Sequence, residues 1–113
     1  MLKSELEYLR HIKDECSFII QYTKDINEED FHANLVLKKA IVRSFEIIGE
    51  ATKKVSHDFR SKYNSVPWKE MAGLRDRLIH DYTGVDYQLL WKISIESIPE
   101  LDYQIEQIIK SHQ

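Results

Sequence analysis

The sequence predicts an all-α protein: one domain, residues 1–113, folded as an up-and-down bundle of four long helices plus a short connecting helix. The composition favours helices, because 31% of residues are charged, 42% are hydrophobic, and only three glycines and two prolines are available for turns. Apolar residues also recur at intervals of three and four, the period of a helix that buries one stripe. The length suits a single core without a second domain.

The first two predicted helices each carry a long apolar stripe. The first spans residues 2 to about 22, and its stripe includes Cys16, which is interpreted as a small buried hydrophobe rather than a nucleophile. Asn27, followed three residues later by Asp30, predicts the N-cap of a second, longer helix. The two stripes consist of Leu2, Leu6, Leu9, Ile12, Cys16 and Ile19, and of Leu37, Ile41, Ser44, Ile48, Ala51 and Val55.

Two carboxylates, Glu46 and Glu50, flank a glycine on the second predicted helix. A glycine destabilises a helix interior by about 1 kcal/mol relative to alanine, so Gly49 indicates that another backbone approaches closely there. Glu46 and Glu50 could act as an acid/base pair, but their spacing favours ion pairing with Arg43 and other cations.

The second half of the chain is predicted to hold a short connecting helix and two further long ones. Residues 57–63 form the connector, and Pro67 fits the first turn of the next helix, where its missing N–H is not needed. That helix buries Trp68, Met71, Leu74 and Leu78, which leaves the intervening polar residues at the rim of the bundle. The final helix is expected to kink or break near residues 97–98, because Pro99 removes a helical hydrogen bond. Its stripe consists of Leu90, Ser94, Ile98, Leu101, Ile105 and Ile108.

Titratable residues are densest in residues 73–84, at the end of the third long helix. Arg75 and His80 would diverge by roughly 140° on a continuous helix. They can therefore converge only if the helix ends near His80, as Thr83 and the glycine after it favour. Asp76, four residues before His80, could orient the imidazole ring.

This combination of side chains suits cleavage of RNA without a metal. His80 can take the 2′-hydroxyl proton near neutral pH, and the Arg75 guanidinium can bind a phosphate whose charge grows during the reaction. Tyr82 supplies a further hydroxyl. The leaving oxygen needs an acid that one chain lacks, so a homodimer sharing one cleft is expected. Structural roles remain open, since a histidine near a helix C-terminus and exposed arginines are both ordinary.

Several classes of protein are excluded or disfavoured. The histidines and the single cysteine show no metal-ligand spacing, and there is no glycine-rich phosphate loop, so neither a metal nor a cofactor is expected. A net charge of −3 argues against coating nucleic acid, so RNA contact must be local. One candidate is a basic group at Lys53, Lys54, Arg60 and Lys62, which could also be a solvated helix end. The lone cysteine and the absence of a leader or long apolar run predict a cytoplasmic protein without membrane contact.

Residues 75–82, RDRLIHDY, resemble the Arg-x4-His-x-Tyr signature of the HepT-like branch of the HEPN superfamily. Residues 43–51, RSFEIIGEA, and residues 66–75, VPWKEMAGLR, also resemble segments typical of this branch. Three motifs in order extend the resemblance over nearly the whole chain. Asp76 is a modest departure, because asparagine is frequent at that place in the family.

The resemblance implies a dimeric helical bundle that acts as the toxin of a type VII-like toxin–antitoxin pair. Its members are described as metal-independent endoribonucleases, with the motif arginine and histidine, here Arg75 and His80, at the centre. The implied partner is a minimal nucleotidyltransferase of the MNT type, which neutralises the toxin by transferring AMP to the motif tyrosine, here Tyr82. A structural alternative for Tyr82 is an aromatic at the bundle edge. The alternative function is a non-catalytic helical module that docks substrate or nucleotide for the nucleotidyltransferase.

Overall fold

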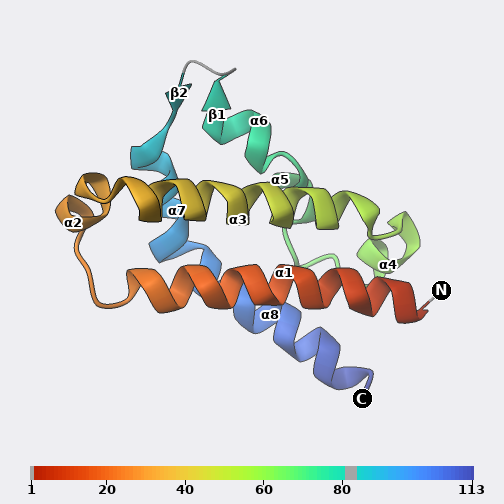
Figure 1. The fold of residues 1–113 in the computed structure, drawn as a ribbon. Coiled ribbons are helices and arrows are strands. Elements are labelled where there is room, and N and C mark those ends of the chain that lie inside the picture. Colours follow the sequence, from red (N-terminus) through yellow and green to blue (C-terminus); the bar gives the residue numbers. More distant parts are fainter. Residues whose placement is uncertain (1, 81–83) are drawn as a thin grey trace.

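The protein, in a computed structural model that describes residues 2–80 and 84–113, is a helical bundle with one small hairpin (Figure 1). This confirms the predicted all-α class. Within the described residues no helix is long and apolar enough to cross a bilayer. The elements in chain order are α1 (Leu2–Thr23), α2 (Glu28–Ala33), α3 (Leu35–Lys54), α4 (His57–Lys62), α5 (Trp68–Ala72), α6 (Leu74–Leu78), β1 (Ile79–His80), β2 (Gly84–Val85), α7 (Tyr87–Glu96) and α8 (Ile98–Ser111).

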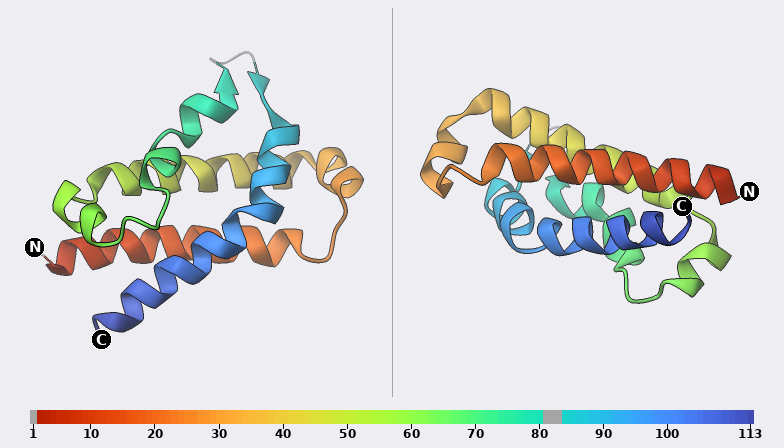
Figure 2. Two further views of the ribbon diagram at one scale, coloured as in Figure 1. Left: turned by 180° about the vertical axis from the view of Figure 1, so that it is seen from behind. Right: turned by 90° about the horizontal axis from the view of Figure 1, so that it is seen from below.

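The helices are arranged in two layers. α1 and α3 run antiparallel side by side, and α5 to α8 cover one side of this pair (Figure 2). The predicted stripes face the interface between the layers, where Leu9, Ile12, Ile41 and Ile48 are fully buried. Ser44, predicted on the second stripe, is also buried.

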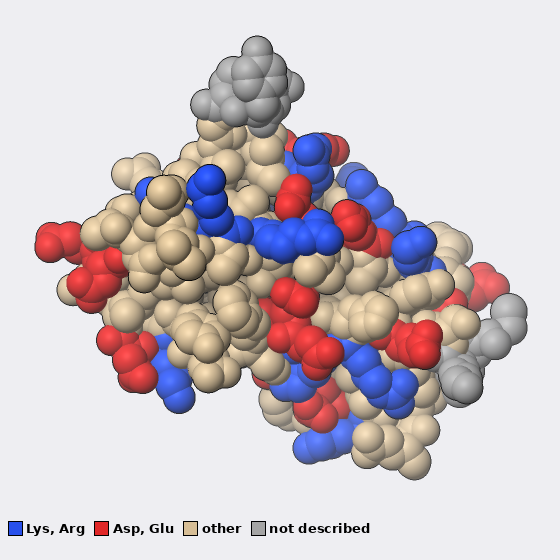
Figure 3. Space-filling model, viewed as in Figure 1, with Lys and Arg blue, Asp and Glu red and all other residues tan. Residues whose placement is uncertain are grey.

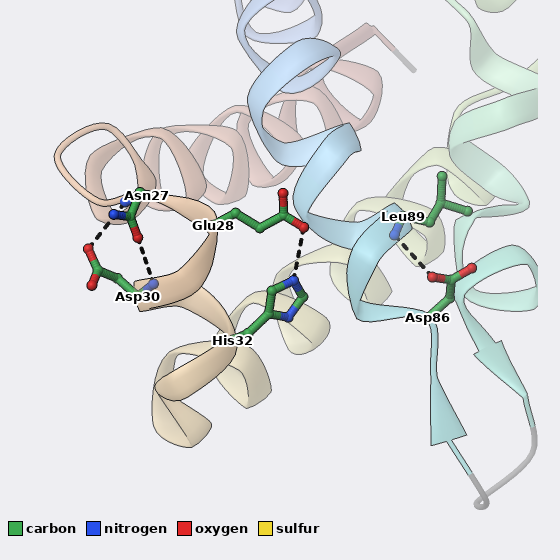
Figure 4. A network of polar contacts seen from close by, with 6 residues as sticks. All are labelled: Asn27, Glu28, Asp30, His32, Asp86 and Leu89. Atoms are coloured by element: carbon green, nitrogen blue, oxygen red, sulfur yellow. Dashed lines mark hydrogen bonds and ion pairs between the residues drawn. The ribbon is translucent and has the colours of Figure 1, made fainter.

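The second predicted helix begins where expected but is two helices rather than one. Asn27 and Asp30 form a capping box at the start of α2, each side chain accepting from the other residue's backbone N–H (Figure 4). α2 then ends at Asn34, whose backbone is extended and whose side chain accepts from the Leu37 N–H to cap α3. The apolar period alone did not reveal the break, because Phe31 is buried in α2 just as Ile41 is in α3.

The third predicted long helix is also divided, into α5 and α6, at Gly73. Pro67 lies at the N-cap position of α5, one residue earlier than predicted, and Trp68, Met71, Leu74 and Leu78 are buried as expected. Gly49 is the point where α5 meets α3: a Cβ added to it would lie 3.4 Å from the Met71 carbonyl oxygen. The predicted close backbone approach at Gly49 is confirmed.

The last predicted helix breaks as its proline indicated. α7 ends at Glu96, Ser97 follows, and Pro99 lies in the first turn of α8. Asp86 caps α7 by accepting from the Leu89 N–H (Figure 4). Lys13 of α1 fixes α8 with ion pairs of 2.8 Å to Asp102 and 3.2 Å to a second carboxylate of α8. Partial burial disfavours the charged ammonium and so acts to lower the pKa of Lys13. The two hydrogen-bonded carboxylates outweigh this effect, and the pKa of Lys13 is raised.

Cys16 is completely buried on the α1 stripe, as its interpretation as a core residue requires. Burial raises the pKa of its thiol to about 12. Because the thiolate is the reactive form, this side chain is inert at neutral pH.

Arg60, which the sequence grouped with the basic residues 53–62, has a structural role. Its guanidinium donates to the carbonyl oxygen of Thr52 and so caps the end of α3 from α4. Ser56 caps α4. Its backbone N–H donates to the Glu5 carboxylate at 3.0 Å, which fixes the junction between α3 and α4 to the start of α1. Three members of the group are exposed: Lys53 and Lys54 in the last turn of α3, and Lys62 in the last turn of α4, where the helix dipole favours cations.

Candidate active site

The motif segment changes from helix to extended chain directly before His80. α6 ends at Leu78, and Ile79 has extended backbone angles. From there side chains alternate between faces, so that Ile79 packs against the core and His80 is exposed. The condition for Arg75 and His80 to converge, a helix that ends near His80, is therefore met.

A short hairpin holds His80 in place. β1 pairs antiparallel with β2, with Ile79 opposite Val85 and His80 opposite Gly84. The Asp86 N–H donates to the Leu78 carbonyl oxygen at 2.8 Å, which closes the base of the hairpin beneath the motif. The hairpin stands at one edge of the molecule, beyond α3 (Figure 1). The sequence did not predict these two strands, since each has only two residues.

Arg75 lies on α6 and contacts α3. Leu74 and Leu78, on either side of it, are buried and fix the face that α6 turns to the core. The Arg75 side chain is 58% exposed, and its Nε lies 3.5 Å from Oε2 of Glu46. The other carboxylate oxygen of Glu46 lies 3.8 Å from Nη1 of Arg43. Ion pairing was the favoured interpretation of Glu46, and it is confirmed; the partner from α6 was not foreseen.

The remaining predicted site residues are Asp76 and Tyr82. Asp76 is exposed on α6, next to the exposed Arg77. The suggestion that Asp76 orients His80 came from a four-residue helical spacing, which the end of α6 at Leu78 interrupts, so that role stays a prediction. Tyr82 lies outside the described residues. Within residues 2–80 and 84–113, no three His, Cys, Asp or Glu side chains are grouped as a metal site requires.

The family model for ribonuclease HepT-like proteins matches residues 12–108, which include both α3 and the complete motif. The chain belongs to this family. It is 47% identical over 112 residues to a "Putative RNase" of Caldanaerobacter subterraneus, covering 99% of this chain and 100% of that protein. It is 46% identical over 99 residues to a "Putative RNase" of Methanocaldococcus jannaschii, covering 88% and 91% of the two chains. It is 41% identical over 110 residues to "Probable ribonuclease HepT" of Thermococcus cleftensis, covering 97% and 100%. No solved structure is significantly similar.

The surface around the HepT-like motif carries both basic and acidic side chains. Basic side chains gather along α3 and beneath the hairpin, with acidic ones between them (Figure 3). Of the cations on α6, Arg77 lines a small pocket of about 200 Å³ together with Met71, Leu74 and Ile98. Arg75 by contrast is open to solvent, and an exposed guanidinium suits a polymer that lies across the surface.

Proposed function

We propose that this HepT-like protein is an endoribonuclease that cleaves RNA without a metal and is the toxin of a type VII-like toxin–antitoxin pair. The observation that carries this proposal is the family match over residues 12–108, which spans the Arg75 to His80 motif. Two structural features support it. Both Arg75 and His80 are exposed, and the helix ends between them.

In the proposed reaction His80 acts as the general base. It takes the proton of a ribose 2′-hydroxyl, and that oxygen attacks the adjacent phosphorus, forming the new P–O2′ bond as the P–O5′ bond breaks. Arg75 binds the phosphate oxygens whose negative charge increases in the transition state. The products are a 2′,3′-cyclic phosphate and a new 5′-hydroxyl.

The departing 5′-oxygen must receive a proton, and a second copy of the chain supplies the acid in this proposal. Two protomers related by a two-fold axis along the hairpin edge bring a second His80 to the same cleft. One imidazole then begins as the base and the other as the acid. Such a site is incomplete in one protomer, so activity is expected from the homodimer alone.

The assay that tests this function uses a single-stranded RNA oligonucleotide, the purified protein and excess EDTA. We expect fragments that end in 2′,3′-cyclic phosphate, and no cleavage of the same sequence with 2′-O-methyl riboses, since that oligonucleotide lacks the nucleophile. Fragments that end in a 3′-hydroxyl, or cleavage that EDTA abolishes, would contradict the mechanism. RNA that is bound but stays intact would support the alternative, a binding module for a nucleotidyltransferase.

Regulation by the partner is proposed to act on Tyr82. Transfer of AMP to its hydroxyl places a bulky anion two residues from His80, where it blocks and repels an RNA phosphate. After co-expression with an MNT-type nucleotidyltransferase, we expect the intact mass of the wild-type chain to rise by whole adenylate units and its RNase activity to fall.

Tyr82→Phe tests this modification, and Tyr103→Phe is its matched control. Tyr103 lies on α8 with 62% of its surface exposed, so it tests whether any accessible tyrosine is modified. We expect Tyr103→Phe to gain mass like the wild type and Tyr82→Phe to gain none. Equal mass gain in both variants, or inhibition without any mass gain, would rule out Tyr82 as the switch.

A further inference from the structure

Glu46 connects two arginines that come from different helices. Its Oε2 lies 3.5 Å from Nε of Arg75 on α6, and its Oε1 lies 3.8 Å from Nη1 of Arg43, one turn earlier on α3. The Glu46 side chain is 25% exposed, whereas the two arginines are 62% and 58% exposed. The carboxylate therefore lies beneath two guanidinium groups that remain open to solvent.

Local packing sets the position of this cluster. Phe45 and Ile48, on either side of Glu46 along α3, are buried. Glu46 therefore lies at the boundary between the buried and the exposed face of α3. One turn on, Gly49 lets the α5 backbone approach α3 within van der Waals contact. Because α6 follows α5 directly, that approach brings Arg75 within reach of Glu46.

The cluster has the composition of a phosphate-binding site. Two cations and one anion leave a net positive charge, and Glu46 engages Arg75 through Nε, which leaves the terminal edge of the guanidinium for two parallel hydrogen bonds to phosphate. Exposed ion pairs contribute little to folding stability, so stability alone gives a weak reason for this arrangement.

We propose that Arg43 and Glu46 extend the RNA site: Glu46 is a positioning residue that orients Arg75, and Arg43 binds a second phosphate of the same strand. This inference rests on the proposed function, because Arg75 is the residue that binds the reacting phosphate there. It adds a stretch of α3 to a site that the motif alone confines to α6 and the hairpin.

The Glu46→Gln variant tests the positioning role, with Glu50→Gln as the matched control. Glu50 lies one turn further along α3 and is exposed. In Glu46→Gln we expect kcat to fall about tenfold or more, since misplacing a catalytic group by an ångström costs up to about a hundredfold. KM should stay the same or decrease, because removing a negative charge favours RNA binding. Equal kcat in the two variants, or a proportional loss of folded protein, would overturn the role of Glu46.

The Arg43→Gln variant tests the second phosphate contact, with Arg10→Gln on α1 as the control. The probe is a single-stranded oligonucleotide with 2′-O-methyl riboses, which binds without being cleaved. Its log Kd is measured against log salt concentration, and the slope should decrease by about 0.7 for each lost phosphate contact. An unchanged slope in Arg43→Gln excludes this contact. If the wild type binds this probe but never cleaves RNA, the proposed function fails while the binding surface stands.

Discussion

The His80→Ala variant is expected to cleave RNA about 10²–10⁴-fold more slowly than the wild type, the range that a positioned general base contributes. In a two-fold dimer the substitution removes both the base and the acid, so the loss should lie toward the upper end. His80 is exposed on β1, and the core stripes do not include it. The melting temperature should therefore change little, and single-turnover cleavage of a labelled RNA measures the rate.

His11→Ala is the control for this substitution, since His11 is exposed on α1, outside the motif. It should cleave RNA like the wild type. Cleavage by His80→Ala at the wild-type rate would remove the histidine from the mechanism. The protein would then either use a different base or act as the non-catalytic binding module.

Arg75→Ala is expected to lower kcat by about 10²–10³-fold, because it removes the charge that stabilises the transition-state phosphate. It also leaves the Glu46 carboxylate without one of its two cations, which adds repulsion toward RNA. Arg75→Lys keeps the charge but lacks the planar fork, so an intermediate rate is expected.

Arg77→Ala is the matched control for Arg75. Arg77 lies on the same short helix, is exposed, and lines the pocket between α6 and α8 rather than contacting Glu46. We expect its kcat to remain within a few-fold of the wild type. Equal losses in Arg75→Ala and Arg77→Ala would mean that α6 contributes only general positive charge.

Local chemistry explains which parts of the fold could be predicted from the sequence. The α1 and α3 stripes, the cap at Asn27 and the break before Pro99 each depend on residues within one or two turns of each other. The breaks at Asn34 and Gly73 were missed, because the apolar residues on both sides continue to face the core and the helical period shows no interruption. The two-residue strands are too short to produce an alternating pattern.

The site divides in the same way. Arg75 and His80 were predicted as site residues from their chemistry and their motif, and that role stays a prediction. The need for the helix to end near His80 followed from simple helix geometry, and α6 does end at Leu78. The contact between Arg75 and Glu46 joins α6 to α3, so no spacing along the chain could reveal it. Gly49 gave the one available signal, because it indicated that another segment of backbone crosses α3 beside Glu46.

If Arg75 and His80 act together on one RNA phosphate, a double-mutant cycle will show the coupling between them. The rates of the wild type, Arg75→Ala, His80→Ala and the double variant are measured on the same RNA in EDTA. Residues that act as a unit are strongly non-additive, so the double variant should be about as slow as the slower single variant. Wild-type rates in all variants, or losses that simply multiply, would contradict a shared site.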